Sequence, residues 1–265
     1  MREYIPRPAE NEAPYVIAHR GISAKAPENT LAAFQRAAET QGIDMIELDV
    51  RLSKDEEVIV FHDRTLQRTT TGNGAARAYT LSELKEFDAG SWFHPAFSNE
   101  RIPTLYEVCE TVGKKLWINI EIKSDIFHRE PEGLLERRVL EVLCECEMLH
   151  RVLISSFDHS LLARLKKIEP RCTTGVLYNL YSDFLFSPSA LVQRVGAEVF
   201  VCAKHELWSW MLKDAHKNGI AVYVYTLDSL QHAERLKERG VDGIMSNRAD
   251  DIVSVVKGIK SEREA

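Results

Sequence analysis

Strand-like apolar runs alternate with helix-like runs along most of this 265-residue chain. After residue 104, the strand-like runs lie at 116–122, 152–156, 173–178, 198–202, 221–226 and 242–245. Two earlier runs, 15–18 and 44–50, bring the number of strands to eight, each followed by a helical pattern. Such alternation favours a parallel sheet wrapped by helices. No glycine-rich dinucleotide fingerprint opens the first helix, which disfavours an open doubly wound sheet. We therefore predict an α/β fold, a single (β/α)8 TIM barrel over residues 1–265.

One short segment breaks the alternation after the second strand. Only seven residues separate the apolar run 58–61 from the strand 44–50, and the last four of them, 54–57, form a short polar link. A parallel crossover needs a dozen or more residues, so these two runs should form an antiparallel hairpin. The hairpin would bring His62 across from about Asp49. Residues 64–103 that follow are rich in turn signals, and we predict a small insertion there.

Two carboxylates share one face of the second strand. Side chains alternate between the faces of a strand, so Glu47 and Asp49 point the same way, opposite to the apolar residues around them. On a half-solvated antiparallel strand this pattern is ordinary. In a barrel both faces are covered, so two inward carboxylates would repel each other and lose hydration unless a cation lies between them.

The strand at 116–122 repeats the pattern, with Glu121 and the following Lys123 on its polar face. This strand should lie beside the second one, which would bring Glu121 within reach of the same cation. We therefore predict that Glu47, Asp49 and Glu121 bind one divalent cation. Three carboxylates without a cysteine favour Mg²⁺ or Ca²⁺ as the cofactor, with Mn²⁺ as a further candidate.

Polar and aromatic residues also gather at the carboxyl ends of the predicted strands, where barrel enzymes build their active sites. His19 and Arg20 follow the first strand. Phe157, Tyr178 and Tyr225 end or follow later strands, and we predict that these three side chains contact the substrate at the rim.

Composition narrows the range of partners. A net charge of −6 offers no basic surface for nucleic acid. No run reaches the roughly 18 apolar residues of a membrane span, and no amphipathic membrane helix is evident, so we expect no stable membrane association. The five cysteines are scattered and odd in number, which predicts no disulfide framework and favours the cytoplasm. The oligomeric state stays open.

Several short motifs follow one another along the chain. They are HRG (19–21), PENT (27–30), IELDV (46–50), HD (62–63), RTTTGNG (68–74), IPTL (102–105) and EIK (121–123). The sequences SSF (155–157) and GVDGI (240–244) come later. Each motif is short, but in this order and over nearly the whole chain they closely resemble the glycerophosphodiester phosphodiesterase family.

This resemblance implies metal-dependent hydrolysis of glycerophosphodiesters to sn-glycerol 3-phosphate and an alcohol, on a barrel with a small insertion after the HD motif. It implies that the three carboxylates above hold the metal. His19 and His62 match the family's acid–base pair, while Arg20 and Lys123 match the residues that face the phosphate. We expect a small soluble phosphodiester as the substrate.

Other interpretations stay open at this point. The same site would suit phospholipase D-type hydrolysis of lysophospholipids or a metal-dependent aldolase, and an inactive binding barrel is a third alternative. Tyr225 stands where the family often has tryptophan, and Ser246-Asn247 where it often has Thr-Asp. The head-group preference, the native metal, the acid and base among the two histidines, and the nucleophile (water or a substrate hydroxyl) are not decided by the sequence.

Overall fold

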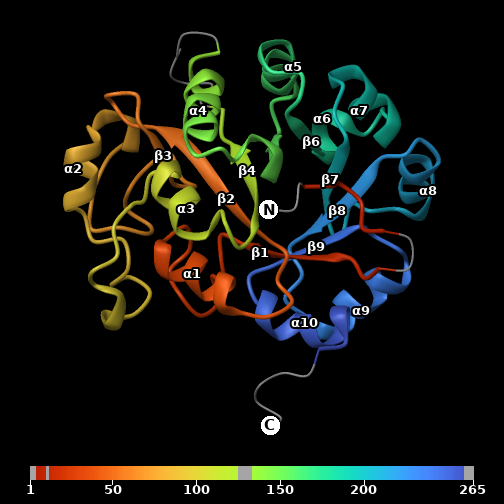
Figure 1. Ribbon diagram of the computed structural model, residues 1–265, viewed down its shortest axis with the longest axis horizontal. Coiled ribbons are helices and arrows are strands. Elements are labelled where there is room, and N and C mark those ends of the chain that lie inside the picture. Colours follow the sequence, from red (N-terminus) through yellow and green to blue (C-terminus); the bar gives the residue numbers. More distant parts are fainter. Residues whose placement is uncertain (1–3, 10–11, 125–132, 260–265) are drawn as a thin grey trace.

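A computed structural model describes residues 4–9, 12–124 and 133–259 of the chain as a closed barrel (Figure 1). Strand β1 (Tyr15–His19) pairs in parallel with both β2 (Met45–Leu52) and β9 (Gly243–Ser246), which closes the sheet on itself. The remaining parallel strands of the barrel are β4 (Trp117–Ile122), β5 (Val152–Ser156), β6 (Thr173–Leu177), β7 (Val199–Ala203) and β8 (Ala221–Tyr225). These eight parallel strands confirm the predicted (β/α)8 TIM barrel.

Helices between the strands form the outer layer of the barrel in Figure 1. They are α1 (Leu31–Glu39), α3 (Leu105–Val112), α4 (Leu134–Glu145), α5 (His159–Ile168), α6 (Leu180–Asp183), α7 (Pro188–Val195), α8 (Ser209–Lys217), α9 (Leu230–Glu238) and α10 (Ala249–Lys257). Side-chain caps fix several helix starts. Thr104, for example, forms a reciprocal capping box with Glu107, which satisfies backbone N–H groups that the helix leaves without partners. Within the described part of the chain, no helix is both long and apolar enough to cross a membrane.

The predicted hairpin is confirmed. Strand β3 (Val58–Val60) pairs antiparallel with β2, and Val50 lies opposite Val60. The following residues contain a 3-10 turn (Ala76–Ala78), helix α2 (Leu81–Glu86) and a second 3-10 turn (Pro95–Phe97). They pack around a small apolar cluster of their own that includes Phe61, Leu66, Leu84 and Ile102. In Figure 1 this segment lies beside the barrel, next to β3.

Aromatic side chains fill the amino-terminal end of the barrel interior. Tyr4, Tyr15, Trp117 and Tyr223 belong to one buried cluster, and the Tyr4 and Tyr223 hydroxyls lie 2.6 Å apart. The rings of Tyr4 and Tyr15 meet the Trp117 ring edge-on, with centroids 5.5 and 5.2 Å away. This packing closes one end of the barrel, so polar side chains on the same inward faces collect at the other end.

Three carboxylates stand directly before strands at the closed end. The side chains of Asp44, Glu198 and Asp242 accept the backbone N–H groups of Val16, Thr174 and Val222, each at 2.8 Å. The sequence predicts strands that begin at these three carboxylates, whereas β2, β7 and β9 each begin one residue after them. A side-chain acceptor of this kind satisfies a backbone N–H of a neighbouring strand where the regular ladder starts.

Candidate active site

A cavity of about 190 Å³ lies at the carboxyl ends of the barrel strands. It is lined by His19, Arg20, Glu47, His62, Asn119, Glu121, Lys123, Ser155, Phe157, Leu177, Tyr225, Thr226 and Met245. Every residue that the sequence predicts for the site is among them, apart from Asp49 and Tyr178. Asp49 lies directly against this group, because it forms an ion pair with Lys123.

The structure places Tyr178, which the sequence predicts as a substrate contact, outside the lining of the cavity. Leu177, the last residue of β6, points into the barrel and lines the cavity. Because side chains alternate, Tyr178 points outward. It is only 4% exposed and packs against Phe200, with ring centroids 5.5 Å apart, in the layer between sheet and helices.

The three predicted metal ligands converge as the alternation of strand side chains requires. In the pairing of β2 with β4, Asp49 lies opposite Glu121. Glu47, Asp49 and Glu121 each place one carboxylate oxygen within 4.8 Å of the others. Oxygen Oε1 of Glu47 is buried without a hydrogen-bond partner among the described residues. A buried acceptor in that state indicates a missing partner.

The electrostatics of the cluster are unfavourable for three free carboxylates. Burial, followed by the charge of Asp49, raises the pKa of Glu47 to about 8. Burial also raises the pKa of Glu121 to about 7, with Asp49 and Glu47 adding repulsion. Burial acts upward on Asp49 too, but Lys123 and then Arg20 outweigh it and hold the pKa of Asp49 well below its usual value.

Two cations offset part of this charge. The Lys123 ammonium lies 2.9 Å from Asp49 Oδ1 and also contacts Glu121. Arg20 Nε lies 3.2 Å from the other oxygen of Asp49. Neither cationic side chain forms an ion pair with Glu47, whose Oε1 has no hydrogen-bond partner among the described residues. A hard divalent cation fits this donor set, because it would ligate the free oxygen and favour the ionised form of both raised carboxyls.

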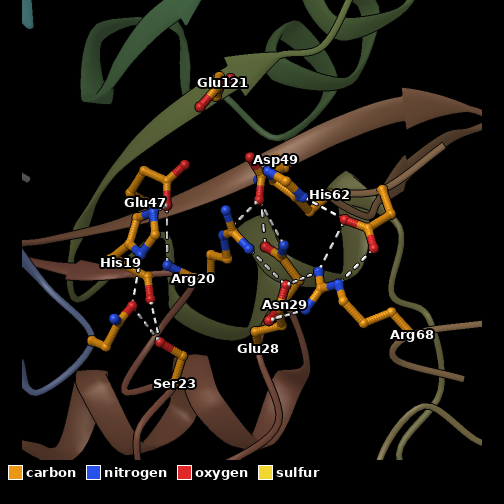
Figure 2. Close-up of polar contacts among 12 residues, drawn as sticks. His19, Arg20, Ser23, Glu28, Asn29, Glu47, Asp49, His62, Arg68 and Glu121 are labelled. Atoms are coloured by element: carbon orange, nitrogen blue, oxygen red, sulfur yellow. Dashed lines mark hydrogen bonds and ion pairs between the residues drawn. The ribbon is translucent and has the colours of Figure 1, made fainter. Parts of the chain in front are cut away.

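The turn after β1 aims Arg20 at the cluster (Figure 2). Arg20 adopts a left-handed backbone conformation, with φ of 56°, and its N–H donates to Glu47 Oε2 at 3.0 Å. Gly21 follows with φ of 79°, and a Cβ there would lie 2.6 Å from the backbone of Ala33. Glycine is therefore required at this point of the HRG motif.

His19 has a neutral hydrogen-bond partner. Its Nδ1 lies 2.7 Å from Asn247 Oδ1, and the Asn247 amide nitrogen donates to Asp228 at 2.8 Å. Since that bond turns the amide oxygen toward the ring, Nδ1 of His19 carries the hydrogen and Nε2 is left as the acceptor. Nε2 lies 3.8 Å from Glu47 Oε2. Burial and then Arg20 lower the pKa of His19.

His62 has a charged partner. Its Nδ1 lies 2.6 Å from Asp63 Oδ1. Burial lowers the pKa of His62, while Asp49 and Asp63 act in the opposite direction. The two histidines of the cavity thus differ in what their Nδ1 atoms contact, an amide in one case and a carboxylate in the other.

Sequence reasoning did not assign several residues that support the site. Asn29, in the PENT motif, has a left-handed backbone and donates to Asp49 Oδ2 at 2.8 Å. Asn119 shares the inward face of β4 with Glu121, which the alternation could have shown, and it accepts the Ser155 hydroxyl at 2.9 Å. Asn247 follows β9, the neighbour of β1, so its closeness to His19 depends on strand order.

Known proteins share both the sequence and the fold. The profile of the glycerophosphoryl diester phosphodiesterase family matches residues 19–251. A glycerophosphodiester phosphodiesterase of Caldanaerobacter subterraneus subsp. tengcongensis is 40% identical over 243 residues, which cover 91% of this chain and 97% of that protein. A glycerophosphodiester phosphodiesterase of Bacillus altitudinis is 33% identical, covering 92% and 99% of the two chains.

Among solved structures, a phosphodiesterase of Oleispira antarctica in complex with the product sn-glycerol 3-phosphate superimposes with a TM-score of 0.83. It is 31% identical, and the match covers 92% of this chain and 97% of that one. A glycerophosphodiester phosphodiesterase of Agrobacterium tumefaciens gives a TM-score of 0.79 at 28% identity, over 91% and 100% of the chains. The protein belongs to the glycerophosphoryl diester phosphodiesterase family.

The metal site can be tested at Glu47. Replacing Glu47 by Gln removes one charge at nearly constant volume and relieves repulsion, so the fold should persist. We expect Glu47→Gln to lose the binding of Mg²⁺, Ca²⁺ or Mn²⁺ in calorimetric titration at pH 7. Glu145→Gln, on an exposed position of α4, serves as the control and should bind as wild type does. Unchanged cation binding by Glu47→Gln would contradict the site.

Proposed function

We propose that this protein hydrolyses glycerophosphodiesters to sn-glycerol 3-phosphate and an alcohol. The observation that carries the proposal is the meeting of three buried carboxylates, two cationic side chains and two histidines at one cavity. Family membership and the Oleispira antarctica phosphodiesterase with its bound sn-glycerol 3-phosphate support it. The cation would be Mg²⁺ or Ca²⁺, with Mn²⁺ as a further candidate, since all three accept carboxylate oxygens.

Phosphate binding would use the cationic side chains of the cavity. A divalent cation at Glu47, Asp49 and Glu121 would stabilise the negative charge that grows on the phosphoryl oxygens. Arg20 presents a planar guanidinium that can bind two phosphate oxygens, and Lys123 adds a point charge. Both side chains already lie against Asp49, which holds them toward the same region.

The partners of the two histidines suggest their roles. In His19 the Nδ1 hydrogen is held by Asn247, so Nε2 is available to take a proton from the attacking water or substrate hydroxyl. In His62 the carboxylate of Asp63 stabilises the protonated ring, which suits donation of a proton to the leaving alkoxide. His19 is then the base and His62 the acid. His19 thus takes one proton from the nucleophile and His62 gives one proton to the leaving alkoxide, so the two transfers balance.

The cysteines and the net charge bear on the cell compartment and on the class of partner. All five cysteines are free thiols, the state that a reducing cytoplasm maintains, so we expect the protein there. The net charge of −6 favours a small-molecule substrate over nucleic acid.

One feature favours a second candidate function. The chain segments after β6 and β7, which include helix α6 and the start of α8, expose Leu180, Tyr181, Phe184, Leu185, Trp208 and Trp210, with Tyr181 92% and Leu185 77% exposed. The two segments are neighbours, because the Leu180 N–H donates to Glu206 at 3.2 Å. Exposed apolar groups gathered in this way often mark an interaction site. This rim lies at the same end of the barrel as the cavity, and the acyl chain of a lysophospholipid could bind it. Phospholipase D-type hydrolysis of lysophospholipids is therefore the alternative to test.

Leaving-group chemistry tests the roles of the histidines. His19→Ala and His62→Ala should each lower kcat on glycerophosphocholine by about 10² to 10⁴, the usual contribution of a general acid or base. A p-nitrophenyl ester of glycerol 3-phosphate needs little acid assistance, because p-nitrophenolate leaves without a proton. His62→Ala should therefore recover most of its loss on this ester, while His19→Ala should not. Equal losses of both variants on both substrates, or recovery by His19→Ala alone, would show the assignment to be wrong.

A substrate panel decides between the two candidate functions. If the glycerol lies inside the cavity and the alcohol faces solvent, kcat/KM for glycerophosphocholine and glycerophosphoethanolamine should agree within about tenfold, or 1.4 kcal/mol. Both should exceed the value for lysophosphatidylcholine. The double variant Tyr181→Ser/Leu185→Ser should leave these values unchanged. A preference for lysophosphatidylcholine that the double variant removes would replace the first function by the second.

A further inference from the structure

Arg68, in the segment after β3, binds two carboxylates at once. Its Nε and one terminal nitrogen donate to the two oxygens of Asp63 at 2.5 and 3.0 Å. Its two terminal nitrogens donate to the two oxygens of Glu28 at 2.8 and 2.7 Å. Figure 2 shows the guanidinium of Arg68 beside Glu28 at the edge of the site. One planar group thus makes two bidentate ion pairs, the arrangement that only arginine can form.

Each of these carboxylates also contacts a residue of the proposed chemistry, through an oxygen that it shares with Arg68. Asp63 Oδ1 is the atom that holds Nδ1 of His62 at 2.6 Å. Glu28 Oε1 accepts a terminal nitrogen of Arg20 at 2.8 Å. The contacts therefore run without a break from His62 through Arg68 to Arg20. Arg68 itself does not line the cavity.

We propose that Arg68 is a positioning residue, which sets the orientation of the acid His62 and of the phosphate-binding Arg20 through one guanidinium. The inference rests on the function proposed above. Without Arg68, Asp63 and Glu28 would be two carboxylates that have lost their shared cation, and each would keep only its contact with His62 or with Arg20. The acceptor that orients the His62 ring would then be less firmly held, and so would the Glu28 carboxylate that holds Arg20. The segment after β3 would in this way orient a site whose three metal-binding carboxylates all lie on barrel strands.

A role in folding alone gives a different expectation. The Arg68 side chain is 45% exposed, and ion pairs at exposed positions contribute little to stability. Removing it should therefore leave the unfolding temperature nearly unchanged. Loss of an outer contact that orients a site residue typically costs about 10- to 100-fold in activity.

The test compares Arg68→Gln, Arg68→Lys and the control Arg101→Gln with wild type on glycerophosphocholine. Arg101 lies in the same segment, and its guanidinium donates to the backbone carbonyls of Ser98 and Glu100. We expect Arg68→Gln to lose about 10- to 100-fold in kcat at an unchanged unfolding temperature. Arg68→Lys should lose an intermediate amount, because one ammonium cannot hold both carboxylates. Added methylguanidine should restore part of the activity of Arg68→Gln only.

A double-mutant cycle shows whether Arg68 acts through Asp63. In the Asp63→Asn background, Arg68→Gln should cost clearly less than it costs in wild type, since the contact to His62 is already weakened. Full activity of Arg68→Gln, a loss accompanied by an equal fall in thermal stability, or a loss that adds fully to that of Asp63→Asn would each overturn the proposal. A wild-type protein without activity on glycerophosphocholine would instead refute the proposed function itself, so the two failures are distinguishable.

Discussion

The site depends on mutual repulsion among three carboxylates that the barrel forces together. Glu47, Asp49 and Glu121 lie on the inward faces of two paired strands, so they cannot separate without breaking the sheet. Lys123 and Arg20 compensate mainly for Asp49, while burial raises the pKa of the other two carboxyls. A group of this kind stores an unfavourable interaction that a divalent cation would relieve.

Next to the three carboxylates, the two histidines of the cavity have different hydrogen-bond partners. His19 is oriented by an amide that Asp228 in turn holds, and His62 by a carboxylate that Arg68 holds. Each histidine therefore depends on a residue that never reaches the cavity. The barrel supplies the first set of contacts and the segment after β3 supplies the second. The segment after β3 therefore contributes to the site by orienting His62, although it lies beside the barrel.

The sequence predicted the barrel and the convergence of the carboxylates because both follow from local periodicity. Alternation along β2 and β4 places Glu47 and Glu121 on inward faces, whatever the details of packing. The same rule, applied to β6, would have shown that Tyr178 points outward. The contacts of Asn247 and Arg68 could not be found this way, because they join segments brought together only by strand order and by the path of the insertion. The exposed apolar residues of the segments after β6 and β7 were also missed, since the exposure of a residue depends on what packs over it.

Crystals grown with Mn²⁺ and glycerol 3-phosphate would test the central claim most directly. An anomalous difference map recorded at the manganese edge should show one peak coordinated by oxygens of Glu47, Asp49 and Glu121. The phosphate should lie against that peak, with Arg20 and Lys123 on its other oxygens. A peak elsewhere, or phosphate bound while the three carboxylates contact only Lys123 and Arg20, would contradict the account.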